Sequence, residues 1–266
     1  MANKKKVLVI ASNLGLWAEE LQGPWDALTK AGHEITLATE KGITPLPMAF
    51  SMDPDFVDPV QKVKVNPLYV TERSKKLIAE GAWDHPIKIR DARMSDYDAL
   101  VVVGGPGSPL DVSGNSKVHK LMVDAWQQDK LIGALCYAVA ALVWARNPET
   151  NKSIIWGKTV VAHPRPWDFT DEMPYPLYNE VPGNEGTDLI SPGFLYPLFV
   201  IVDDAVGPDG KVLTDPKATH EKPLVHADWP FVTGLSVESS AAFGDLVVQE
   251  LARHSQVPAG AGSGAA

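Results

Sequence analysis

The sequence contains a single cysteine in 266 residues, Cys136, which excludes an internal disulfide and a cysteine-based metal cluster. Long apolar runs are also missing, since no stretch approaches the about 18 residues of a membrane-spanning helix. The 24 Lys and Arg residues are outnumbered by 33 Asp and Glu, so neither nucleic acid nor an anionic membrane is expected as a partner. No closely spaced His, Asp and Glu pattern predicts a metal site. The scarcity of cysteine is compatible with a reducing, cytoplasmic location, which we expect.

The composition is typical of a globular protein, with 45% hydrophobic and 21% charged residues. We predict a single domain over residues 1–255 and a flexible tail over 256–266, where "PAGAGSGAA" is rich in small residues. The N-terminal stretch "KVLVIA" is short and is followed by acidic residues without a small-residue cleavage site. It is therefore interpreted as a first strand and not as a signal peptide.

Predicted strands and helices alternate along most of the chain. Apolar runs rich in Val and Ile predict strands, and apolar residues at helical spacing predict helices. The strands are expected at 5–12, 33–39, 98–105, 131–136 and 158–163, and the helices at 19–31, 115–130, 137–145 and 239–254. This order predicts an α/β fold, a three-layer open sandwich with a mostly parallel sheet.

Two stretches depart from the alternation, at about 43–92 and 164–230. Both are rich in proline, and the first is expected to hold at most one helix, near 71–80. Excursions of this length are often lids or partner surfaces. Their many aromatic side chains either pack the excursions or build a pocket larger than a small dicarbonyl needs, which would favour a specialised metabolic substrate. The aromatic residues in question are Trp83, Trp156, Trp167, Phe169, Tyr175, Tyr178, Phe194, Tyr196 and Trp229.

Cys136 lies between a predicted buried strand and a predicted helix. At such a turn the side chain is presented above the carboxyl edge of the sheet, where ligands gather. Backbone N–H groups at a helix start favour a thiolate and can hold a developing oxyanion. A small buried hydrophobic residue is the alternative for a lone cysteine.

Three other segments supply candidate groups. "VVVGGPGSPLD" ends a strand in a glycine turn, whose useful amide is that of Gly105 or Gly107, although a plain turn is equally compatible. Pro24 predicts an irregular helix start near Glu20, which would let this carboxyl project over the sheet edge; the alternative is that Glu19 and Glu20 face solvent. His163, before a proline, is a surface residue, a satisfied edge residue or the base for a thiol. His220 and His226 have no motif around them.

Together these segments resemble the ThiJ/PfpI superfamily, which includes deglycases, glyoxalase III-like chaperones and, more distantly, class I glutamine amidotransferase domains. Four stretches carry the resemblance: "EELQGPWDALTKAG", "DALVVVGGPGSPLD", "LIGALCYAVAAL" and "FVTGLSVESSAAFGDLVVQEL". It implies a flavodoxin-like sheet with a nucleophile elbow and a homodimer. It also implies that Cys136 is the nucleophile, Glu20 its carboxyl partner, and Gly105 and Tyr137 the donors of oxyanion-binding amides.

The residue after the cysteine departs from many relatives, which have histidine there. Tyr137 occupies that position, which weakens a protease-like activity, and its phenol is expected on a helix surface or at an interface. The deglycase branch also lacks that histidine and has one in a strand-end His-Pro pair. "VVAHP" matches this pair, so His163 is the candidate histidine beside the thiol.

The resulting expectation is a cofactor-independent enzyme whose thiol adds to a small electrophilic carbonyl or C–N substrate. Glyoxalase III-like hydration of methylglyoxal to lactate is the first choice. A small-molecule hydratase or amidase-type hydrolase of a specialised pathway is one alternative. A redox-responsive holding chaperone, in which Cys136 is oxidised, is the other.

Overall fold

A computed structural model describes residues 4–168, 173–174, 177–178, 190–191 and 193–254. The main sheet is built from β1 (Lys6–Ile10), β2 (Glu34–Thr39), β3 (Ile87–Lys88), β4 (Ala99–Val102), β5 (Leu131–Leu135), β10 (Val225–Asp228) and β11 (Phe231–Gly234). The strand order is β10–β11–β5–β4–β1–β2–β3, and every neighbouring pair is parallel except β10 with β11. The predicted mostly parallel sheet is confirmed.

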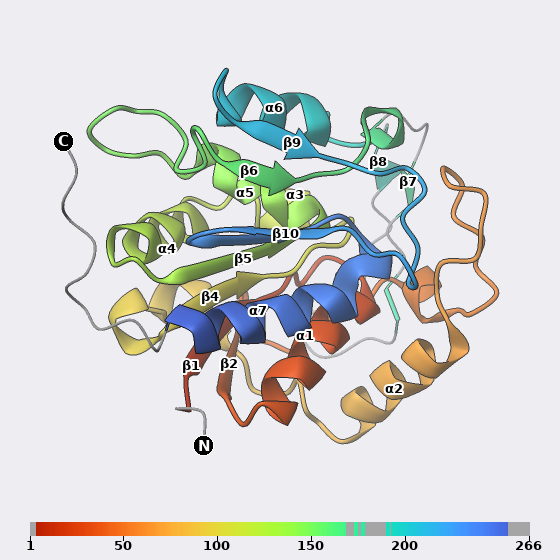
Figure 1. Cartoon of the computed structure of the whole chain (residues 1–266). Coiled ribbons are helices and arrows are strands. Elements are labelled where there is room, and N and C mark those ends of the chain that lie inside the picture. The colour runs from red at the N-terminus through yellow and green to blue at the C-terminus, as the bar shows by residue number, and fades with distance from the viewer. Residues whose placement is uncertain (1–3, 169–172, 175–176, 179–189, 192, 255–266) are drawn as a thin grey trace.

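Helices cover both faces of this sheet (Figure 1). They are α1 (Ala18–Lys30), α2 (Leu68–Ala79), α3 (Ser108–Asp111), α4 (Ser116–Gln127), α5 (Val139–Trp144), α6 (Leu198–Val206) and α7 (Ser240–His254). Helices α1 and α7 pack against each other on one face, while α4 and α5 pack on the other, and α6 lies outside α5. The predicted three-layer α/β sandwich is therefore confirmed. In the described part of the chain, no helix is long and apolar enough to cross a membrane.

The central strands are buried on both faces, which explains why they have unbroken apolar runs. All four residues of β4 and all five of β5 are buried. A parallel strand covered by helices on each side has no solvent-facing positions for polar residues. Because β1, β4 and β5 are parallel, their C-terminal ends lie at the same edge of the sheet, and the candidate groups lie there.

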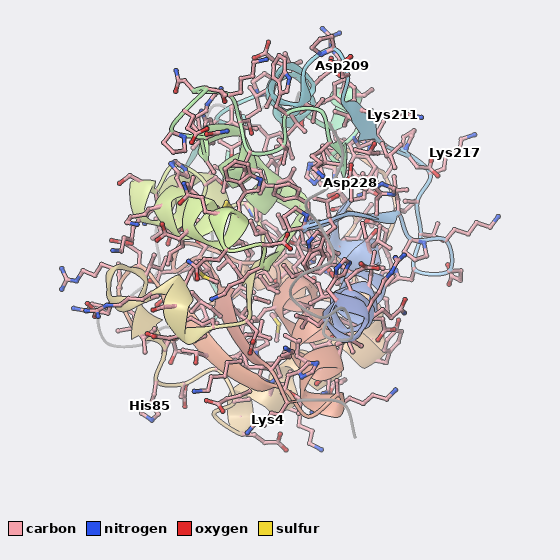
Figure 2. All side chains as sticks on the ribbon, turned by 60° about the vertical axis from the view of Figure 1, so that its left-hand side comes forward. Lys4, His85, Asp209, Lys211, Lys217 and Asp228 are labelled. Atoms are coloured by element: carbon pink, nitrogen blue, oxygen red, sulfur yellow. The ribbon has the colours of Figure 1, made fainter. Side chains whose placement is uncertain are left out.

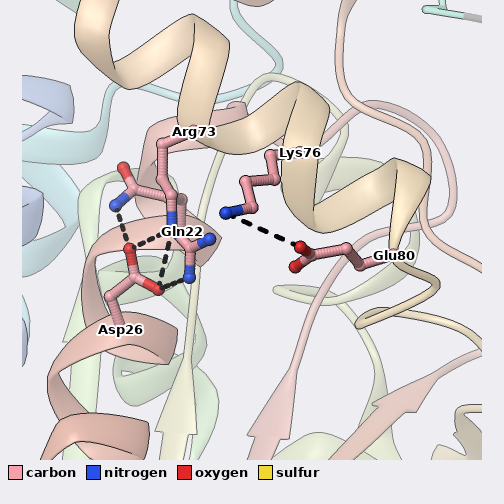
Figure 3. A network of polar contacts seen from close by, with 5 residues as sticks. All are labelled: Gln22, Asp26, Arg73, Lys76 and Glu80. Atoms are coloured by element: carbon pink, nitrogen blue, oxygen red, sulfur yellow. Dashed lines mark hydrogen bonds and ion pairs between the residues drawn. The ribbon is translucent and has the colours of Figure 1, made fainter.

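Helix α2 attaches the first excursion to the sandwich through α1. The guanidinium of Arg73 donates to both carboxylate oxygens of Asp26, and the Gln22 amide donates to the same carboxylate (Figure 3). The Arg73 Nε to Asp26 Oδ2 distance is 2.9 Å. A two-pronged contact of this kind holds the helices in a fixed relative position. The neighbouring Lys76–Glu80 pair lies within α2 and its C-cap, at 3.7 Å.

The two excursions were predicted to depart from the sheet, but each of them also contributes a strand to it. Strand β3 lies in the first one and forms one edge of the main sheet, and antiparallel β10 lies in the second and forms the other edge. The stretch predicted as a fifth strand forms β6 (Thr159–Val161), but it pairs with β9 (Lys211–Leu213) in a separate small sheet. A further pair joins β7 (Met173–Pro174) to β8 (Ile190–Ser191). Short strands of two to four residues carry too little periodicity to be recognised in sequence.

Several polar contacts fix the small β6–β9 sheet to the edge of the main sheet. Lys158 donates to the Asp228 carboxylate at 3.0 Å, and the Thr159 amide donates to the other oxygen at 2.8 Å. Figure 2 shows Asp228 beside the segment that carries Lys211 and Lys217, with Lys4 and His85 at the opposite end of the molecule. The predicted tail over 256–266 lies outside the described residues.

Candidate active site

Cys136 is the first residue after β5 and has a left-handed backbone, with φ of 58°. A residue with a side chain is strained there by roughly 1–2 kcal/mol, and such strain is typical of a nucleophile presented on a strand-to-helix turn. The turn Cys136–Ala138 is a 3-10 helix, and α5 begins at Val139, two residues later than predicted. The amides near the sulfur therefore belong to a tight turn and not to a long helix N-terminus.

The glycine turn after β4 faces the cysteine turn. Burial raises the pKa of the Cys136 thiol. The backbone N–H groups of Gly105 and Tyr137 act on the sulfur in the opposite direction, but their effect is smaller. Gly104 permits the close approach, since a Cβ at this position would lie 2.8 Å from Glu20 Oε2 and 2.9 Å from the Tyr137 nitrogen. Two N–H groups directed at one sulfur are donors that a negatively charged oxygen beside that sulfur could use.

Glu20 lies in the first turn of α1, which begins at Ala18, so its carboxyl reaches the site without the irregular helix start that Pro24 predicted near Glu20. Its side chain is buried, with 1% exposure. Neither carboxyl oxygen has a partner with hydrogen-bond geometry among the described residues, although the Cys136 thiol and the Gly104 amide are near enough to affect it. Burial is the main cause that raises the pKa of Glu20 to about 8.

His163 lies two residues beyond β6 and directs Nε2 at the sulfur, with an Nε2–Sγ distance of 3.2 Å. Burial lowers the pKa of this imidazole to about 3, so it is neutral at physiological pH. The edge contact with the Tyr137 ring, whose centroid is 4.7 Å away, holds the imidazole in place. Nδ1 is buried without a hydrogen-bond partner in the described chain, so no carboxylate orients this histidine.

The protonation of Cys136 and Glu20 is coupled, because each anion disfavours the other. A Glu20 carboxylate raises the thiol pKa, and burial raises both values, so the pair loses its first proton near pH 8 and its second well above. The form with one proton contains either a thiolate beside a carboxylic acid or a thiol beside a carboxylate. Either way, the proton can pass to a substrate oxygen without leaving the site.

A cavity of about 60 Å³ opens beside the sulfur. On the measure in which one water needs roughly 10–15 Å³, this volume accommodates about four to six water-sized groups. Val60 and Gln61 of the first excursion form one wall, and Trp167 and Phe194 of the second form another. The space therefore suits a substrate of a few heavy atoms.

Among the described aromatic residues of the excursions, Trp167 and Phe194 alone line the cavity, so this part of the chain does not show the larger aromatic pocket. Trp83 is buried in the main core, and Trp229 stacks on His254. Phe169 and Tyr175 lie outside the described residues. The prediction of a helix-surface position for the Tyr137 phenol is wrong, since this residue is buried and lines the cavity, because the 3-10 turn directs it inward.

Sequence reasoning missed several groups of the site. Trp17 lines the cavity and donates from Nε1 to Asn66 of the first excursion at 3.0 Å. Ser236 and Val237, after β11, also line the cavity. His220 Nε2 contacts both Glu19 carboxyl oxygens, at 3.0 and 3.1 Å. Glu19 and His220 are 201 positions apart, so no sequence spacing could predict their contact. The adjacent acidic pair at 19–20 was the one feature of the sequence that pointed to this region.

The described residues contain no group of three or more His, Cys, Asp or Glu side chains arranged to hold a metal ion. The polar groups at the sulfur are the backbone amides of Gly105 and Tyr137, the Glu20 carboxyl and the His163 imidazole. This set can bind an oxyanion and move protons.

Comparison with known proteins identifies the family. The model of the family described as ThiJ/PfpI family-like matches residues 11–160, more than half of the chain. The chain belongs to the ThiJ/PfpI family. This membership confirms the resemblance that the four sequence stretches carried, and the matched range includes Glu20, Gly105, Cys136 and Tyr137.

Several known proteins are similar to this chain over most of its length. Glyoxalase 3 of Candida albicans is 22% identical over 239 residues, 88% of either chain. The crystal structure of glyoxalase III from the same organism has a TM-score of 0.62 at 18% identity, covering 92% of this chain and 96% of that one. Rapid Encystment Protein 24 kDa of Francisella tularensis has a TM-score of 0.64 at 20% identity, covering 93% and 99%. At these identities the structural likeness establishes the shared fold.

Proposed function

We propose that this ThiJ/PfpI protein is a cofactor-independent enzyme that converts a small α-oxoaldehyde into an α-hydroxy acid, with methylglyoxal and lactate as first substrate and product. The observation that carries the proposal is the convergence of a strained Cys136, a buried Glu20 and a neutral His163 on one small cavity. The similarity to Glyoxalase 3 of Candida albicans supports the choice of substrate.

In the first step the Cys136 sulfur adds to the aldehyde carbon, and the carbonyl π electrons move to the oxygen. The amides of Gly105 and Tyr137 stabilise the alkoxide, and the carboxyl proton of Glu20 neutralises it. A thiohemiacetal and a Glu20 carboxylate result. The proton that burial holds on Glu20 is thus delivered where negative charge develops.

In the second step the Glu20 carboxylate removes the proton from the sulfur-bound carbon, C1, and the C–H electrons move through the C1–C2 bond to the C2 oxygen, so that an enediolate forms. Glu20 then returns that proton to the adjacent carbon, C2, while the hydroxyl proton on the C1 oxygen passes to the C2 oxygen, which gives a lactoyl thioester and the Glu20 carboxylate. C1 is oxidised and C2 is reduced, so no external oxidant or reductant is required. The single carboxyl beside the sulfur serves both transfers.

In the last step water attacks the thioester, and the C–S bond breaks. His163, neutral and 3.2 Å from the sulfur, accepts a proton from the water and returns it to the thiolate. The sum is methylglyoxal plus water giving lactate and one proton. That proton has to leave a site in which Glu20 and Cys136 are both buried.

The small, occluded sulfur favours this activity over redox sensing. Cys136 has 4% exposure, and burial raises its pKa, whereas sensor cysteines are accessible thiols of low pKa. The thiol therefore requires a molecule small enough to enter the cavity.

The test is incubation of the purified protein with methylglyoxal, with lactate measured enzymatically. Cys136→Ser and Glu20→Gln are expected to abolish lactate formation, while Glu80→Gln, a solvent-facing carboxyl of α2, is expected to keep it. A panel of small amides and nitriles is assayed in parallel. Wild-type turnover of that panel without turnover of methylglyoxal would replace the proposal by the hydrolase or hydratase alternative.

A further inference from the structure

Three buried carboxyls act on one another electrostatically near the cavity, and only one of them is needed for the chemistry above. Glu19 and Glu20 are consecutive in α1, with 3% and 1% exposure, and Glu238 has 6% exposure in the 3-10 turn Val237–Ser239. Buried carboxyls normally have a basic partner each. Among the described residues, the three carboxyls have one basic partner between them, His220, which contacts Glu19.

Glu238 connects the acidic group with the cavity wall. Its neighbours Ser236 and Val237 line the cavity together with Glu20. One carboxyl oxygen accepts from the Ser239 hydroxyl at 2.8 Å, while Oε2 is buried without a partner in the described chain. The charges of Glu238 and Glu19 both act on Glu20, which places the three carboxyls in one electrostatic group.

His220 connects the acidic group with solvent. Its side chain is 23% exposed, whereas that of Glu19 is 3% exposed, so the pair runs from the interior to the surface. The histidine lies beside a tight turn in which Thr219 and Lys222 pair through their backbones. The charged and titratable groups that face the pair are Glu20 and Glu238 from the site, Glu221 from the turn and Tyr69 from α2.

We propose that Glu19, Glu238 and His220 form a proton path between Glu20 and solvent. The inference rests on the proposed function, in which Glu20 gives up and takes up protons although it has almost no solvent contact. Burial raises the pKa of Glu19 and Glu238, so these carboxyls keep their protons to a higher pH than solvent-exposed carboxyls do. His220, whose pKa Glu19 raises, passes protons between this group and water.

The path has a signature that is separate from overall activity. During turnover in D₂O, Glu20 takes a light hydrogen from C1 and returns hydrogen to C2. If Glu20 exchanges with solvent through the path before that return, the lactate carries deuterium at C2. If the path is closed, the original hydrogen is carried over. A change that only loosened the fold would give solvent easier access to Glu20, and it would therefore not lower the deuterium fraction.

The experiment measures the deuterium fraction at C2 of lactate by mass spectrometry, with methylglyoxal in D₂O. Wild-type protein is expected to give mainly deuterated lactate. His220→Gln, Glu19→Gln and Glu238→Gln are each expected to lower the fraction at least threefold. His85→Gln and Glu80→Gln, at the surface, are the matched controls and are expected to give the wild-type fraction.

The outcomes separate the two proposals. Wild-type lactate with little deuterium, or equal deuterium in wild type and all three variants, would overturn the path and leave the proposed function standing. No lactate from wild-type protein would overturn both. Three independent positions are changed, so a variant that does not fold leaves two that decide the matter.

Discussion

Replacement of Glu20 by glutamine is predicted to stabilise the folded protein more as the pH rises. The amide has nearly the shape of the protonated carboxyl but cannot ionise. Burial raises the pKa of Glu20 from 4.5 to about 8, so the folded state binds this proton more tightly than the unfolded chain does. That stabilisation is fully present below pH 4.5 and is lost as the pH rises toward 8.

The size of the effect follows from the difference between the two pKa values. Each pKa unit corresponds to about 1.4 kcal/mol, so the wild type loses roughly 3 to 4 kcal/mol of this contribution between pH 5 and pH 8. Glu20→Gln does not lose it. The difference in free energy of unfolding, variant minus wild type, is therefore expected to grow by that amount over this range. A constant offset from the amide's own contacts does not affect the slope.

Urea unfolding at pH 5, 6, 7 and 8, followed by tryptophan fluorescence, gives the two free energies at each pH. Glu80→Gln on the surface of α2 is the control and is expected to run parallel to the wild type. A Glu20→Gln curve that also ran parallel to the wild type would show that this carboxyl is ionised in the folded protein near neutrality. The proton donation assigned to Glu20 would then be refuted.

Three further predictions concern catalysis with methylglyoxal. The value of kcat/KM is expected to rise about tenfold per pH unit up to about pH 8, where the Cys–Glu pair loses its first proton; a flat profile from pH 6 to 8 would contradict this. His163→Gln is expected to lower kcat by about 10²-fold while surface His85→Gln keeps it, and equal values would remove His163 from the mechanism. Gly104→Ala places a Cβ 2.8 Å from Glu20 Oε2 and 2.9 Å from the Tyr137 nitrogen, so we expect kcat/KM to fall at least tenfold and unfolding to cost about 1–3 kcal/mol less. Wild-type values in both assays would mean that the glycine turn tolerates a side chain.

The elements that the sequence predicted are those with long, unambiguous apolar patterns. The strands that became β1, β2, β4 and β5 and the helices α1, α4 and α7 lie within their predicted ranges, give or take the terminal residues. Edge strands β3 and β10 were missed because two to four residues contain no measurable period. Strand β6 was found, but its assignment to a separate sheet depends on its pairing with β9, which no local pattern encodes.

The sequence predicted those site residues that lie in a turn directly after a strand. It did not predict those that reach the site through packing between distant segments. Cys136 had to lie at the sheet edge because it ends a buried strand, and Gly105 because it ends the neighbouring one. The role given to His163 came from the family resemblance, and the structure places it at the sulfur. The Glu19–His220 contact joins α1 to a turn far along the chain, so nothing local could have indicated it.

The residues around the cavity come from different parts of the chain, and this affects how substrate selectivity can change. Cys136, Glu20 and the Gly105 and Tyr137 amides are attached to the ends of β4, β5 and α1, while Val60, Gln61, Trp167 and Phe194 come from the two excursions. In the proposed function, the reacting groups and this part of the cavity lining therefore belong to separate stretches of polypeptide. Loops of this kind tolerate insertion and exchange far better than core strands do. Grafting the 58–61 segment of another family member onto this scaffold would therefore alter which molecules reach the sulfur and leave the chemistry at the sulfur in place.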